Sequence, residues 1–114
     1  KCLYALSCLD LLSISLLPSS ETELSFDTQS GRKKLTAEEY VSIMDILSPS
    51  FAIQPFPEVS GYSQKKRIGK SVKNSTTFAR DCLSLIKKHN ETKETSKLCK
   101  FWPNVTGGTD LNSR

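Results

Sequence analysis

One helix with a marked start and a marked stop constrains the fold of this chain more than any other feature. Thr36 and Glu39 have the capping-box spacing, in which the Thr hydroxyl accepts from an early helical N–H and the Glu carboxylate reaches back to the cap. Apolar residues recur at helical spacing up to Leu47, and Pro49 then removes the next backbone donor. The pattern predicts a helix over residues 36–47.

Short apolar runs and turn residues surround this helix. Residues 23–26 alternate between polar and apolar, and residues 27–31 supply turn residues, including a Gly. We therefore expect a hairpin with a five-residue connection to lead into the helix. Residues 51–54 form a short apolar run that Pro55 ends. A helix that feeds a short buried strand is half of a βαβ unit.

A second helix is predicted from about residue 63 to Lys88, because apolar and small residues recur along one face. Residues 90–97 are polar and are interpreted as a linker. A third short strand is expected within residues 98–105, followed by a Gly-Gly turn. The residues predicted to form the buried face of the second helix are Ile68, Val72, Thr76, Ala79, Leu83 and Ile86.

The order of strands and helices predicts an α/β fold with parallel strands. Three buried parallel strands have open edges that need neighbours, so the chain is expected to be an incomplete fragment of a larger sheet. Residues 1–22 form an apolar, Ser-rich segment, and residues 23–114 form the predicted domain. Within the first segment, a strand and a helix fit equally well.

The formal net charge is +4, and the excess cationic charge gathers at the start of the second helix. Such a cluster can contact RNA phosphates, which are bound without base specificity, or it can be a solvated helix face. A small RNA-binding module is disfavoured because the chain lacks aromatic stacking platforms. The cationic residues of this cluster are Lys65, Lys66, Arg67, Lys70 and Lys73.

The four cysteines have no C-x-x-C spacing, and the single histidine, His89, lies in a Lys-rich stretch where a solvated side chain is expected. We therefore expect no metal site in this chain. The alternative to an intracellular protein is a small secreted, glycosylated, disulfide-bonded protein. Its support is the Leu-rich start after Lys1, the even cysteine count and the three glycosylation sequons at Asn74, Asn90 and Asn104.

Four stretches, in this order, resemble motifs of the tRNA-guanine (queuine) transglycosylase family. They are residues 24–38 (similar to a hairpin leading to "LTPE"), residues 46–51 (similar to "LGSD"), residues 70–75 (similar to "KSV-x-RS") and residues 105–108 (similar to "VQGG"). Ala37 stands where the family has Pro, and Asn74 where it has Arg. The resemblance covers residues 23–114 and implies a partial (β/α) TIM-type barrel.

The family exchanges a guanine of a tRNA anticodon for queuine or a precursor, using two carboxylates. The second carboxylate follows a strand in the motif "FDE", where this chain has Phe56-Pro57-Glu58. Pro57 has no ionisable group and cannot serve as a general base, and Glu58 is not expected to replace it. The "DSGGFQ" loop of catalytic members is missing too. The resemblance is therefore to the non-catalytic accessory subunit, and no catalytic residue is expected here.

The family's "VQGG" glutamine holds the incoming base, and Thr106 stands in its place. A hydroxyl is shorter than an amide and cannot make its paired contact. Gly107 and Gly108 remain, and their backbone can pass close to a planar ligand or simply form a tight turn. By resemblance, these three residues are the candidates for substrate binding.

The resemblance also implies partners and location. The family's nucleophile and its zinc site, formed by three Cys and one His, would lie beyond Arg114, so no cofactor is expected in this chain. The implied partners are a catalytic subunit in a heterodimer and, through that complex, tRNA. The implied location is the cytoplasm, with peripheral association at the mitochondrial outer surface as a further implication.

Overall fold

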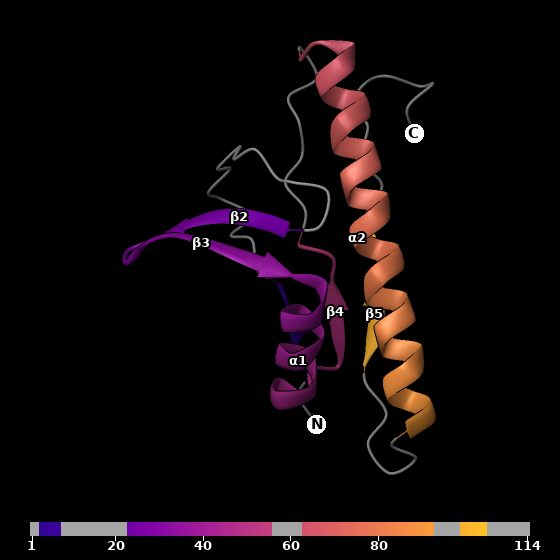
Figure 1. Ribbon diagram of the computed structural model, residues 1–114. Helices are drawn as coiled ribbons and strands as arrows, with labels where there is room; N and C mark the ends of the chain where they lie inside the picture. Colours follow the sequence, from indigo (N-terminus) through magenta and orange to yellow (C-terminus); the bar gives the residue numbers. More distant parts are fainter. Residues whose placement is uncertain (1–2, 8–22, 56–62, 93–98, 105–114) are drawn as a thin grey trace.

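A computed structural model describes residues 3–7, 23–55, 63–92 and 99–104 of the chain (Figure 1). These residues form a three-stranded parallel sheet, a separate two-stranded hairpin and two helices. The parallel sheet contains β1 (Ala5–Leu6), β4 (Phe51–Ile53) and β5 (Lys100–Trp102), in the order β1-β4-β5. The remaining elements are β2 (Glu23–Thr28), β3 (Gly31–Thr36), α1 (Ala37–Leu47) and α2 (Lys65–Thr92).

The hairpin is confirmed, but its predicted five-residue connection is wrong. Asp27 and Thr28 belong to β2, and Thr28 pairs with Gly31, so only Gln29 and Ser30 connect the strands. The Thr28 hydroxyl closes the turn, donating to the Gly31 carbonyl over 2.8 Å and accepting from the Ser30 N–H over 3.2 Å. Gly31 has a φ of 100°, a left-handed conformation that suits a residue without a Cβ.

The predicted capping box at the start of α1 is confirmed. The Glu39 N–H donates to the Thr36 hydroxyl over 3.3 Å, and the Thr36 N–H donates to the Glu39 carboxylate over 2.9 Å. Ser48 caps the end of the helix, and its N–H donates to the Met44 carbonyl over 3.0 Å. Ser48 has a φ of 45°, the left-handed conformation that commonly ends a helix, and Pro49 then prevents the helix from continuing.

The predicted parallel pairing is confirmed in the described sheet. Ala5 pairs with Phe51, and Ile53 pairs with Trp102. The strand alternative for the N-terminal segment is correct at Ala5–Leu6, whereas residues 8–22 lie outside the described residues. Because β1 pairs with β4, a strand from the predicted segment 1–22 lies in the same sheet as strands from the predicted domain 23–114. The boundary at residue 22 stays a prediction.

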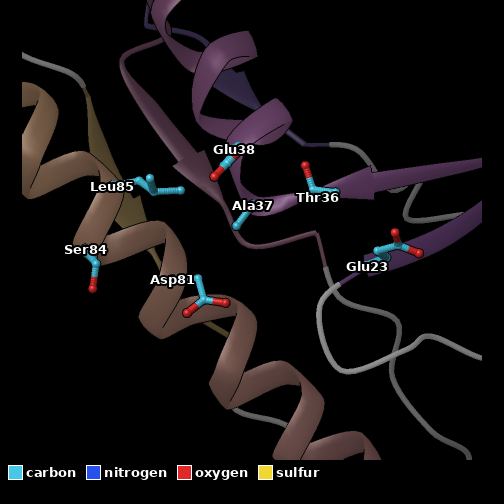
Figure 2. Close-up of a pocket in the computed structure, with 7 residues that line it drawn as sticks. All are labelled: Glu23, Thr36, Ala37, Glu38, Asp81, Ser84 and Leu85. Atoms are coloured by element: carbon cyan, nitrogen blue, oxygen red, sulfur yellow. The ribbon is translucent and has the colours of Figure 1, made fainter.

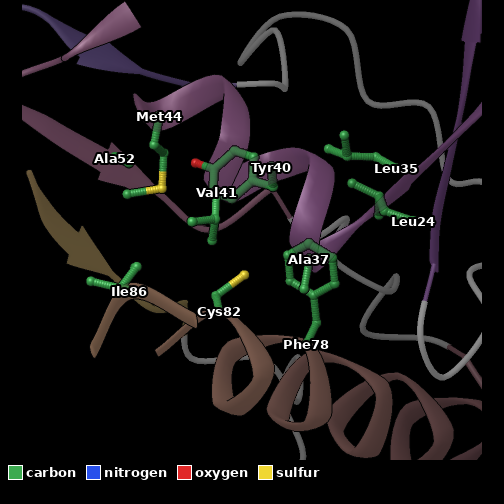
Figure 3. Close-up of a cluster of buried hydrophobic side chains, with 10 residues drawn as sticks. All are labelled: Leu24, Leu35, Ala37, Tyr40, Val41, Met44, Ala52, Phe78, Cys82 and Ile86. Carbon is green, nitrogen blue, oxygen red and sulfur yellow. The ribbon is translucent and has the colours of Figure 1, made fainter. Parts of the chain in front are cut away.

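Both helices pack on one face of the sheet and against each other (Figures 1 and 3). Tyr40 of α1 is fully buried between Phe78 of α2 and Phe101 of β5, with ring centroids 6.3 and 6.4 Å away. Its hydroxyl donates to the Ile53 carbonyl over 2.6 Å. Burying one such side chain contributes about 1.5–3 kcal/mol. The core cluster is Leu24, Leu35, Ala37, Tyr40, Val41, Met44, Ala52, Phe78, Cys82 and Ile86.

The opposite face of the sheet is only partly covered. Strand side chains alternate between faces, so Phe51 and Trp102 point away from the helices while Ala52 points toward them. The rings of Phe51 and Trp102 stack with centroids 4.7 Å apart, and Trp102 keeps 54% of its surface exposed. This face presents apolar surface.

The predicted buried face of α2 is partly wrong, and the helix extends to Thr92 rather than Lys88. Ile68 and Ile86 are buried as expected, but Leu83 is 49% exposed and Thr76 is also exposed. In the middle of the helix the buried residues Ser75, Phe78 and Cys82 each lie one position before the predicted ones. Because α2 packs on α1, the contact with α1 selects among several apolar faces. The buried residues of α2 are Ile68, Asn74, Ser75, Phe78, Cys82 and Ile86.

Candidate functional site at the carboxyl edge of the parallel sheet

The carboxyl ends of β4 and β5 meet at one edge of the parallel sheet. Gln54 directly follows β4, and Asn104 comes two residues after β5. In folds where helices connect parallel strands, the residues that act on ligands gather at this edge. The carboxyl edge is therefore the place to look for a functional site.

Gln54 is the central residue of this edge, with only 1% of its surface exposed. Its side-chain Nε2 donates to both the carbonyl and the hydroxyl of Ser75 in α2, over 2.9 Å each. Its Oε1 accepts from the Asn104 N–H over 3.0 Å. The Asn104 side-chain amide in turn donates to the Gln54 carbonyl over 2.9 Å. One buried amide thus joins β4, α2 and the chain after β5.

Sequence reasoning missed Gln54, Ser75 and Asn104 as site residues. Their contacts join residues 21 and 50 positions apart, which no local pattern reveals. One signal was available, because a Gln at the end of an apolar run must find partners if the run is buried.

Helix α2 extends beyond the carboxyl edge. Because Gln54 contacts Ser75, the ten residues of α2 before Ser75 project about 15 Å past the sheet, at a rise of about 1.5 Å per residue. Figure 1 shows this part of α2 rising above the sheet and the hairpin. All four residues predicted to contact RNA lie on it and are exposed, as a solvated or ligand-binding face requires. They are Lys65, Lys66, Arg67 and Lys70.

The charges at the start of α2 have one sign. The first turn of the helix contains no acidic residue. The unpaired N–H groups of a helix start add partial positive charge to that of the side chains. The projecting start of α2 therefore attracts anions such as phosphate.

The other predicted site residues cannot be placed. Pro57 and Glu58, like the base-binding candidates Thr106, Gly107 and Gly108, lie outside the described residues. Asn104, which Gln54 holds, precedes Thr106 by two positions in the sequence.

A separate pocket of about 450 Å³ lies between the hairpin, the start of α1 and the middle of α2 (Figure 2). Its carboxylates would repel a phosphate, and the Glu23 carboxylate is already 2.8 Å from Lys34 Nζ. Phosphate is therefore attracted to the start of α2 and not to this pocket. The residues lining the pocket are Glu23, Thr36, Ala37, Glu38, Asp81, Ser84 and Leu85.

The reactive side chains of the described residues are mostly engaged in the fold. Cys82 and Cys99 are both free thiols. Burial, with a smaller contribution from Asp81, raises the pKa of Cys82 to about 12, and burial also raises the pKa of Cys99. The prediction that His89 is solvated is wrong: its side chain is 17% exposed, and its Nε2 lies 3.3 Å from an Asp45 oxygen of α1.

The described ranges contain neither a helix suited to span a membrane nor a cluster of metal-ligating side chains. None of their helices is both long and apolar enough to cross a membrane. In the same ranges, no three His, Cys, Asp or Glu side chains come together as a metal ion would need.

The asparagines of two glycosylation sequons, Asn74 and Asn104, are held by the fold. Asn74 has 1% of its surface exposed, so its amide is inaccessible in the folded chain. The Asn104 amide is hydrogen-bonded to Gln54.

Comparison with known proteins places the chain among its relatives. The family model for queuine tRNA-ribosyltransferase matches residues 6–114. The chain belongs to the queuine tRNA-ribosyltransferase family. The resemblance inferred from the four ordered motifs is thus confirmed.

Three similar proteins are each named queuine tRNA-ribosyltransferase accessory subunit 2. The protein from Culex quinquefasciatus is 35% identical over 61% of this chain and 17% of its own length. The protein from Xenopus laevis is 35% identical over 74% of this chain and 20% of its own length. The protein from Trichoplax adhaerens is 32% identical over 76% of this chain and 22% of its own length. The chain therefore aligns with about a fifth of the length of each relative.

Proposed function

We propose that this chain is part of a non-catalytic accessory subunit that supports the exchange of guanine for queuine in tRNA anticodons. The observation that carries the proposal is the shared name of its relatives from three distant animals. Pro57 supports the non-catalytic part, because a side chain without an ionisable group cannot move a proton. The partner would be a catalytic subunit that supplies both carboxylates.

A base-exchange assay tests this proposal. The full protein alone, a catalytic subunit alone and the two together would be incubated with guanine-containing tRNA and labelled queuine. The expected result is incorporation only when the catalytic subunit is present, with a higher rate when both are present. Incorporation by the full protein alone, or no effect of adding it to the catalytic subunit, would refute the proposal.

Two features of the described sheet support a partial barrel. Its strands follow one another in chain order, and both helices lie on one face. Interior side chains of a (β/α) barrel need the other strands to cover them, and the partly exposed Phe51–Trp102 stack has the character of such an interior. We therefore propose that β1, β4 and β5 are three neighbouring strands of a barrel. Trp102→Asp should prevent folding of the full protein, whereas normal folding of this variant would contradict the barrel.

The projecting start of α2 is proposed to contact tRNA phosphates. Four exposed cations and a helix start lie together there without an acidic residue in the first turn. Phosphate contacts release counterions, so each contact that is lost weakens binding and flattens its dependence on salt. A variant with Lys65, Lys66, Arg67 and Lys70 all changed to Glu should bind tRNA far more weakly. If the variant binds tRNA with unchanged affinity and unchanged dependence on salt, the cluster is a solvated helix face and the proposed contact is refuted.

The proposed location is the cytoplasm, including a peripheral position at the mitochondrial outer surface. The support is the family resemblance alone. Cell fractionation with a salt wash tests it, because a peripherally bound protein is released by salt. Recovery of a glycosylated form from the culture medium would instead favour the secreted alternative.

A further inference from the structure

The hydrogen bonds between β4 and β5 change character at Gln54. The Gln54 N–H still donates to the Trp102 carbonyl over 2.9 Å, as the parallel ladder requires. The next ladder bond would run from the Asn104 N–H to the Gln54 carbonyl. Instead, the Asn104 N–H goes to the Gln54 side chain, and the Asn104 side chain goes to the Gln54 carbonyl. Two side-chain amides have replaced one backbone bond.

This replacement sets the direction of the chain. Side-chain amides inserted between the two backbones hold Asn104 farther from β4 than a ladder bond would, yet at a fixed place. Pro103, which has no N–H, ends regular pairing at the same point. Gln54 therefore fixes the position of Asn104, two residues beyond β5.

The same side chain also holds α2. Its Nε2 has both hydrogens directed at Ser75, one to the carbonyl and one to the hydroxyl. Ser75 is the point from which the basic start of α2 projects. A buried amide with all three side-chain bonds made is rigid, because breaking any one of them leaves a buried polar group without a partner.

We infer that Gln54 is a positioning residue for tRNA, which fixes the basic start of α2 relative to the chain that leaves β5 at Asn104. This inference rests on the proposed contact between α2 and tRNA phosphates. The basic start of α2 and Asn104 keep one relative placement because Gln54 is hydrogen-bonded to both Ser75 and Asn104. Loss of that amide loosens this placement, although Phe78 and Cys82 still pack α2 on the core, so tRNA binding must restore the order.

The test is steady-state base exchange by the full protein with its catalytic subunit. Gln54→Met keeps the length and volume of the side chain but removes both polar atoms. The expected result is a KM for tRNA raised about three- to tenfold with kcat retained, since the reacting groups lie in the partner. Asn104→Ala, a change at an exposed residue, should raise KM in the same direction by less. Because both variants disrupt the same Gln54–Asn104 hydrogen bonds, the KM of the double variant should not exceed that of Gln54→Met.

Met44→Ala is the matched control, since it removes a buried side chain of α1 that makes none of the hydrogen bonds of the Gln54 network. It should lower thermal stability and the amount of active complex without changing KM. If Gln54→Met and Asn104→Ala also leave KM unchanged, the inference is overturned. The four-site α2 charge variant then locates the failure. A raised KM in that variant confines the failure to Gln54, and an unchanged KM extends it to the proposed tRNA contact.

Discussion

Helix α1 begins with a hydroxyl cap and two carboxylates, whereas helix α2 begins with three cationic side chains. At α1, Thr36 and Glu39 satisfy each other's backbone N–H groups, and Glu38 adds a second negative charge. At α2, Lys65, Lys66 and Arg67 place positive charge at the positive end of the helix dipole. The start of α1 therefore stabilises α1. The cationic start of α2 instead destabilises α2, by about 0.3–1 kcal/mol for each charge.

The difference shows where each helix obtains its stability. Helix α1 is stabilised at its start and by its packing, whereas α2 depends on packing alone, chiefly that of the residues from Ser75 onward against α1 and Gln54. A helix start that departs from the local rules while remaining exposed is typical of a binding surface. The predictions that follow test this division of α2 into a packed part and a projecting part.

Phe78→Ala should have the largest effect, because Phe78 is 1% exposed in the packed part of α2. Truncation of a buried Phe costs about 3–5 kcal/mol. The free energy of unfolding, measured by urea denaturation with circular dichroism, should fall by this amount. Leu83→Ala is the control on the exposed face of the same helix and should cost less than about 1 kcal/mol. Equal losses for the two variants would contradict the observed face of α2.

Cys82 should make the packed part of α2 sensitive to alkaline pH. Its pKa of about 12 in the folded protein exceeds the ordinary value of 9.0, so the folded state keeps the proton longer than the unfolded state does. Stability is thus unaffected below pH 9 and falls as the pH rises from 9 toward 12. Urea denaturation across this window should show a steeper loss than in Cys82→Ala. Parallel losses in the two proteins would show that the thiol does not contribute.

Thr36→Ala should have a smaller effect at the start of α1. Loss of the cap leaves the Glu39 N–H without its hydroxyl partner, which costs about 1 kcal/mol. Thr36→Ser is the control, since it keeps the hydroxyl and should keep most of the stability. A variant as stable as the parent protein would show that the capping box contributes nothing here.

The sequence predicted the elements that are determined by interactions between residues close together in the chain. The α1 capping box depends on residues three positions apart, and its prediction was correct nearly to the residue. The hairpin was found, but its turn was placed too wide because the hydroxyl of Thr28 was not recognised as closing it.

Features that depend on distant contacts were missed or mistaken. The buried face of α2 is chosen by α1, so Phe78 and Cys82 are inside where Leu83 was expected. The Gln54–Asn104 bonds span 50 residues and left no trace in spacing. The exposed cations of the candidate site were predictable because charge and exposure are local properties.

Lys66→Glu should have the smallest effect on stability, and of opposite sign. A negative charge in the first turn of α2 suits the helix dipole, so the free energy of unfolding should rise by about 0.3–1 kcal/mol. The affinity for tRNA should fall nevertheless, and the salt slope of binding should decrease by about one. Lys88→Glu near the other end of α2 makes the same change of charge and should slightly lower stability without affecting tRNA. A variant that gains stability and loses RNA affinity together would show that the start of α2 favours binding over stability. If Lys66→Glu gains stability and binds tRNA normally, or if Lys88→Glu weakens binding equally, the projecting part of α2 is not a distinct RNA surface.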